Sequence, residues 1–75
     1  MFVDDKIVQF AEALCSAAEL GPGHGAKLIE AAKQVATSQQ RSWVSPHDVK
    51  TALRTYPHGK PDAVIAHALD YTEVP

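Results

Sequence analysis

The amino-acid sequence predicts an all-α fold, a small bundle of four helices with one short extended linker. Apolar residues recur at intervals of three and four along most of the chain, which is the period of an amphipathic α-helix. Stretches that contain glycine or proline interrupt this pattern between the periodic segments. The chain has 75 residues, a length that favours a single domain with a small core.

The first helix is expected over about residues 3–20. Two acidic residues at positions 4 and 5 favour the positive end of a helix dipole. The periodic pattern stops where Gly21, Pro22 and Gly23 make a continued helix costly. Its apolar stripe, with Ala11 and Cys15 beside it, consists of Val3, Ile7, Phe10, Leu14 and Ala18.

A second helix is expected over about residues 25–40, followed by a short extended linker at 41–44. Trp43 and Val44 favour extended backbone, and Trp43 is the only tryptophan. We expect Trp43 to pin the linker against the helices; the alternative is that it forms an exposed contact site. The apolar face of the second helix, with Ile29 at its edge, consists of Leu28, Ala32, Val35 and Ala36.

The third helix is expected over about residues 46–54. Pro46 pushes Ser45 out of the helical region and itself suits the first helical position. Asp48 follows Ser45 by three residues, which is the spacing of a capping box with Asp in place of Glu. Its buried side is expected to consist of Val49, Ala52 and Leu53.

The fourth helix is expected over about residues 61–71. It follows a loop, TYPHGKP, that contains two prolines and a glycine. Pro61 lies at its start and Asp62 in its first turn. Its apolar face consists of Val64, Ile65, Ala68 and Leu69.

Charge and cysteine content exclude several classes of function. The formal net charge is −2, and no run of basic residues could neutralise neighbouring phosphates, so we expect neither nucleic acid nor an anionic membrane as a partner. A single cysteine permits no internal disulfide and suits a reducing cytosol.

No apolar run approaches the ~20 residues of a membrane span, and the N-terminus lacks the basic start of a signal peptide. We therefore expect a cytoplasmic protein.

The glycine-rich stretch before the second helix has the outward form of a phosphate-binding loop. The motif requires a second glycine, then lysine, then serine or threonine. Here Ala26 occupies the second glycine position and Leu28 the hydroxyl position after Lys27. The stretch also follows an amphipathic helix instead of a buried strand. It is better interpreted as a turn between helices, and no nucleotide cofactor is expected for the chain by itself.

No metal site and no catalytic residues are expected. The candidate metal ligands lack the spacing of known ligand sets, and the histidines are expected to be solvated. Cys15 lies beside an apolar stripe, which is typical of a small buried hydrophobe and not of a reactive thiol. The chain is therefore not expected to be an enzyme by itself. The residues that could have served as ligands or nucleophile are His24, His47, His58, His67 and Cys15.

One segment resembles the C-terminal lid domain of MoxR-type AAA+ ATPases. It spans residues 20–53, with the sequence LGPGHGAKLIEAAKQVATSQQRSWVSPHDVKTAL. The resemblance is carried by the glycine-containing turn, by the helix rich in alanine that follows it, and most of all by the V-S-P-H-D-V element at 44–49. It implies a helical lid that packs against an ATPase core and meets ATP only through that core. The partner would then be a protein.

The sequence departs from the family pattern at the turn and near the end. Gly25 stands where the family has a sensor arginine, and His24 is the nearest substitute for that charge. An added loop, RTYPHGKP, precedes the last helix. The resemblance therefore supports a lid fold more than a nucleotide contact.

The leading interpretation is a lid or interaction module without catalysis of its own, either part of a larger AAA+ ATPase or a stand-alone relative of its lid. A histone-fold-like subunit that dimerises is the alternative, although this sequence lacks the long central helix and basic surface of that fold. A small enzyme or cofactor binder has no support beyond the failed phosphate loop. The residues expected to face a partner lie in the turn and the linker: Pro22, His24, Lys27, Arg41 and Trp43.

Overall fold

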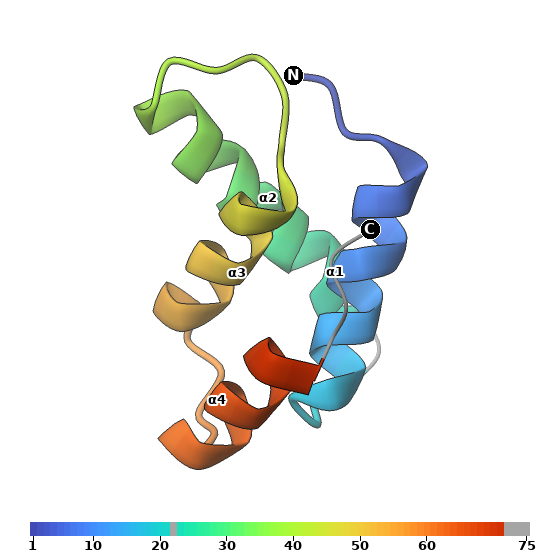
Figure 1. Cartoon of the computed structure of the whole chain (residues 1–75), viewed down its shortest axis with the longest axis vertical. Coiled ribbons are helices and arrows are strands. Elements are labelled where there is room, and N and C mark those ends of the chain that lie inside the picture. The colour runs from blue at the N-terminus through green and yellow to red at the C-terminus, as the bar shows by residue number, and fades with distance from the viewer. Residues whose placement is uncertain (22, 72–75) are drawn as a thin grey trace.

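Four α-helices pack around one apolar core (Figure 1). They are α1 (Asp5–Ala17), α2 (His24–Ser38), α3 (Pro46–Thr55) and α4 (Asp62–Tyr71). The computed structural model describes residues 1–21 and 23–71. Within these residues there is no strand, only an isolated parallel bridge between Phe2 and Trp43. The predicted all-α four-helix bundle is confirmed.

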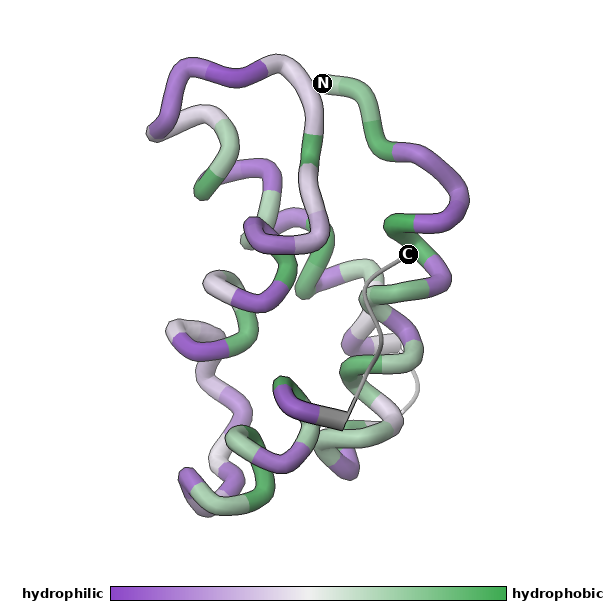
Figure 2. Tube along the Cα trace, in the orientation of Figure 1, coloured by the Kyte–Doolittle hydropathy of each residue, from purple (hydrophilic) through white to green (hydrophobic). Residues whose placement is uncertain are grey.

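The predicted apolar faces form the core, except that Val64 of α4 is only part-buried and does not belong to it. α2 packs against both α1 and α3, and α4 closes the bundle against α1 and α3. Hydrophobic and hydrophilic residues alternate along the helices, as an amphipathic pattern requires (Figure 2). None of the described helices has the length and apolar character to cross a bilayer. The buried apolar residues are Ile7, Phe10, Ala11, Leu14, Cys15, Ala18, Leu28, Ile29, Ala32, Ala36, Val44, Val49, Ala52, Leu53, Ile65 and Ala68.

The first helix begins two residues later than the sequence pattern indicates. Asp4 is the N-cap of α1, and its carboxylate accepts a hydrogen bond from the backbone amide of Lys6 at 2.9 Å. Val3, which was expected in the helical stripe, precedes this cap and packs against the core from extended backbone. The chain before Asp4 is consequently available to pair with the linker.

Both long helices end in a Schellman motif whose left-handed residue is not glycine. α1 therefore ends at Ala17 and not near residue 20, and α2 ends at Ser38 and not at 40. The left-handed residues are Glu19, with φ 59°, and Gln40, with φ 60°. In each motif the next amide donates to the carbonyl five residues earlier, at 2.8 Å after α1 and 3.0 Å after α2. Because glycine usually marks this position, the sequence does not indicate that Glu19 and Gln40 take the left-handed conformation, and both helices end earlier than expected.

The third helix begins as predicted. The Ser45 hydroxyl accepts from the Asp48 amide at 3.3 Å, and the Asp48 carboxylate accepts from the Ser45 amide at 2.8 Å. This is the capping box expected from the spacing, with Pro46 in the first turn. α3 ends at Thr55 and α4 begins at Asp62, each one residue later than expected.

Replacing the left-handed residue after α2 by glycine is expected to stabilise the fold. A side chain in the left-handed region costs about 1–2 kcal/mol, which glycine would avoid. The extra entropy of glycine in the unfolded chain offsets part of this gain. Gln40→Gly should therefore raise the free energy of unfolding by about 0.5–1 kcal/mol in urea titrations. The matched control is Gln34→Gly, at an exposed position inside α2, which should lower it. A loss of stability in both variants would contradict the assigned end of α2.

Candidate functional site

The N-terminal segment and the linker between α2 and α3 lie side by side (Figure 1). The Phe2 amide donates to the Ser42 carbonyl at 2.9 Å, and the Val44 amide donates to the Phe2 carbonyl at 3.1 Å. These two bonds place Phe2 opposite Trp43 in a parallel bridge. The predicted extended linker is thus fixed by backbone pairing with residues far away in the sequence.

This pairing sets which side chains face solvent. Successive side chains of extended backbone point to opposite faces. Val44 is buried in the core at 4% exposure and Val3 packs against that core, so their neighbours Trp43 and Phe2 point outward. Trp43 is 51% exposed and Phe2 is 64% exposed. The expectation that the Trp43 ring pins the linker against the helices is therefore wrong, because Val44 takes the inward position.

Phe2, Trp43 and the adjoining Met1 form what we call the aromatic surface. Met1 is 52% exposed, so all three large apolar side chains meet solvent. Trp43 also has the Arg41 guanidinium 5.7 Å from its ring centre, which is within range of a cation–π contact. The surface therefore combines two exposed aromatic rings with a backbone that is hydrogen-bonded through the amide and carbonyl of Phe2.

A buried carboxylate holds both ends of the linker, and we call this arrangement the Asp48 clamp. Asp48 is fully buried, and both of its oxygens accept hydrogen bonds from the Arg41 guanidinium, one of them at 2.7 Å. The same carboxylate accepts the Ser45 amide. Arg41, which was expected to face a partner, instead directs its charge inward. The clamp consists of Asp48, Arg41 and Ser45, and it ties the end of α2 to the start of α3.

The clamp lowers the pKa of Asp48. Burial alone would raise the pKa of this carboxyl group, but the hydrogen bonds from Arg41 and Ser45 outweigh burial and hold the pKa below its usual value. Because the pKa is lower in the folded state than in the unfolded state, the ionised carboxylate stabilises the fold at neutral pH. This contribution is lost as the pH falls through the folded-state pKa.

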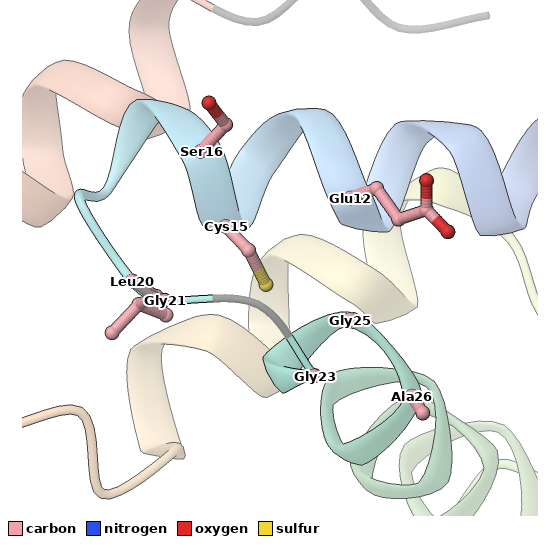
Figure 3. A pocket seen from close by; sticks show the side chains of 8 residues that line it. All are labelled: Glu12, Cys15, Ser16, Leu20, Gly21, Gly23, Gly25 and Ala26. Carbon is pink, nitrogen blue, oxygen red and sulfur yellow. The ribbon is translucent and has the colours of Figure 1, made fainter.

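The turn between α1 and α2 borders an open hollow of about 550 Å³ (Figure 3). The Cys15 sulfur points toward this turn in Figure 3. Burial, and secondarily the charge of Glu12, raise the pKa of the Cys15 thiol, which keeps it protonated and a poor nucleophile at neutral pH. The hollow thus has no activated thiol.

Gly25 lies against α1. A Cβ atom on Gly25 would come within 3.1 Å of the Glu12 Cγ atom. Glycine therefore permits the close approach of α1 and α2 at this point, and a longer side chain would require Glu12 to shift. Gly23, by contrast, is needed for its conformation, because its φ of 92° lies in the left-handed region.

His24 joins the start of α2 to the end of α3. Its Nδ1 atom lies 2.8 Å from the Tyr56 hydroxyl, and the two rings meet edge to face at 5.8 Å. His58 is also engaged, since its Nδ1 atom accepts the Lys60 amide at 2.9 Å. The histidines were expected to be solvated; His24 and His58 are part-buried, and each has a polar neighbour that the sequence did not indicate.

The remaining candidate residues lie apart from one another. Lys27 is exposed in the first turn of α2, and His47 and His67 are exposed on α3 and α4. Pro22 lies outside the described residues. Within 1–21 and 23–71, the structure brings together no group of three potential metal ligands.

Several residues of the site were missed by sequence reasoning. In the sequence Phe2 is only the residue before the first helix, and the pairing partner of the linker could not be deduced from either segment alone. A usable signal existed in the succession Trp43, Val44, since extended backbone must turn one of the two outward. For Asp48 the capping role was visible, but its burial with Arg41 was not.

Comparisons with protein-family models, with curated proteins and with solved structures give no match to this chain. The resemblance to AAA+ lids therefore rests on the quoted residues alone.

Asp48→Asn is expected to lower the free energy of unfolding at pH 7 by about 2 kcal/mol, because hydrogen bonds to a charged group contribute about 1.5–3 kcal/mol. It should also flatten the loss of stability on acidification, since the titrating carboxylate is gone. Urea unfolding followed from neutral pH into the acid range measures both effects.

The control for this prediction is Glu30→Gln. Glu30 forms an exposed ion pair with Lys33 at 3.2 Å, and such pairs contribute little. This variant should retain both the stability and the acid dependence of the original chain. An acid dependence in Asp48→Asn that equals that of the original chain would show that Asp48 does not carry the effect.

Proposed function

We propose that this chain is a non-catalytic helical interaction module that binds a protein partner through its aromatic surface. The observation that carries the proposal is the exposure of Phe2 and Trp43 side by side, at 64% and 51%. Aromatic side chains are enriched at protein interfaces, where they bury a large area for little loss of conformational freedom.

The rigidity behind the aromatic surface supports the same proposal. The bridge to Phe2 fixes the middle of the linker, and the Asp48 clamp fixes its two ends. A surface that is already ordered loses less entropy when it binds. A purely structural linker would gain more by turning Trp43 toward the core than by leaving it in water.

The resemblance to MoxR-type lids suggests which partner to test first, namely an AAA+ ATPase core in the cytoplasm. The clamp residues Ser45 and Asp48 belong to the V-S-P-H-D-V element on which that resemblance chiefly rests. In this proposal ATP is bound by the partner and not by the chain. Gly25 provides no cation, and His24 is engaged with Tyr56, so we do not propose a phosphate contact at the turn.

A photoreactive amino acid at the surface tests the proposal in cells. Trp43→p-benzoylphenylalanine should give one discrete covalent adduct with another protein after irradiation, because position 43 would lie inside the interface. Mass spectrometry identifies the adduct. Introducing Phe2→Ser into the same chain should abolish it, because Phe2 forms the other half of the surface.

The matched control carries the same photoreactive residue at Arg54, which is exposed near the other end of α3. The adduct should be missing there. Equal adducts at both positions, or none at position 43, would contradict the proposed surface. An adduct with twice the mass of the chain would identify self-association. Micromolar ATP binding by the isolated chain would contradict the proposal that only the partner binds ATP.

A further inference from the structure

We infer that the partner is bound as an extended peptide strand that pairs with the backbone of Trp43, an inference that rests on the proposed function. In the parallel bridge, the linker uses the carbonyl of Ser42 and the amide of Val44 to bind Phe2. The amide and carbonyl of Trp43 itself point to the opposite edge. Neither has a hydrogen-bond partner among residues 1–21 and 23–71.

An exposed extended segment with an unpaired donor and acceptor is a template for another strand. Because one residue supplies both groups, a single residue of an extended peptide can satisfy both. The side chain of that peptide residue would then lie on the face that carries the Trp43 and Phe2 rings, and its two neighbours would point to the opposite face. The backbone would supply main-chain affinity, and the rings would select apolar side chains.

The edge is ordered before any peptide arrives. On one side the Arg41 amide closes the Schellman motif of α2, and its guanidinium binds Asp48. On the other side Ser45 is fixed by the capping box, and Val44 is buried. The extended conformation of Trp43 is thus set by its neighbours and does not have to be created on binding.

The size of the surface favours a short peptide over a second copy of the chain. From their exposed fractions, Met1, Phe2 and Trp43 together offer on the order of 300 Å² of apolar side-chain area. A stable dimer needs roughly 800 Å² from each partner. A strand of a few residues matches the available area, whereas a second copy would require contacts beyond it.

The probe is an acetylated and amidated hexapeptide that alternates valine and threonine, added to the isotope-labelled whole chain. We expect the Trp43 amide resonance to move to lower field and to saturate at millimolar peptide, while the amide of Arg54 remains in place. A peptide N-methylated at its central valine is the matched control. It cannot complete the pairing, so its binding should be roughly tenfold weaker, the equivalent of one lost hydrogen bond.

Trp43→Ala separates the backbone from the ring. This variant keeps the amide and carbonyl at position 43, and since the ring is half-exposed the fold should be retained. The overall affinity should fall, but the roughly tenfold effect of N-methylation should persist. Loss of the N-methylation effect in this variant would mean that the peptide recognises the ring alone.

Three other results would contradict strand pairing at Trp43. If both peptides shift the Trp43 indole and Phe2 ring resonances equally and leave the Trp43 amide in place, the surface binds protein without strand pairing. The inference then fails while the proposed function stands. If neither peptide shifts any of these resonances at millimolar concentration, the inference is also overturned. A dimer in light scattering, with the Trp43 amide protected before peptide is added, would assign the edge to a second copy instead.

Discussion

The buried carboxylate of Asp48 is the interaction on which the rest of this structure depends. It caps the first turn of α3 through the Ser45 amide and binds the Arg41 guanidinium at the end of α2. These bonds fix the two ends of the linker, so the residues between them have little freedom. Val44 then reaches the core, and Trp43 is turned to solvent because its neighbour is turned inward.

Burying a carboxylate is costly unless its oxygens are bonded, and in Asp48 both oxygens are bonded. A buried pair of this kind is weak evidence for net stability, because replacing it by apolar residues can be neutral or favourable. Its clearer consequence is geometric, since the carboxylate holds Arg41 and Ser45 at the two ends of the linker. That arrangement leaves the edge of Trp43 open to the proposed partner strand.

The helices could be predicted because their signals are local. The stripe containing Leu14 and the box formed by Ser45 and Asp48 each lie within one segment of sequence. The ends of α1 and α2 were harder to predict, because Glu19 and Gln40 occupy positions that glycine usually marks. The candidate surface was predicted only in part. Trp43 was identified as a candidate contact residue, but its exposure depends on pairing with Phe2. That contact joins two distant segments, and the sequence of neither segment predicts it alone.

Amide hydrogen exchange at Val44 tests most directly whether the clamp holds the linker in place. In the original chain the Val44 amide donates to the Phe2 carbonyl and should be protected. In Asp48→Asn, released linker ends should loosen this pairing, so Val44 should lose far more protection than the core amide of Leu14. Val44 protection that declines only in step with that of Leu14 would contradict this dependence, because the linker would then hold its position without the clamp.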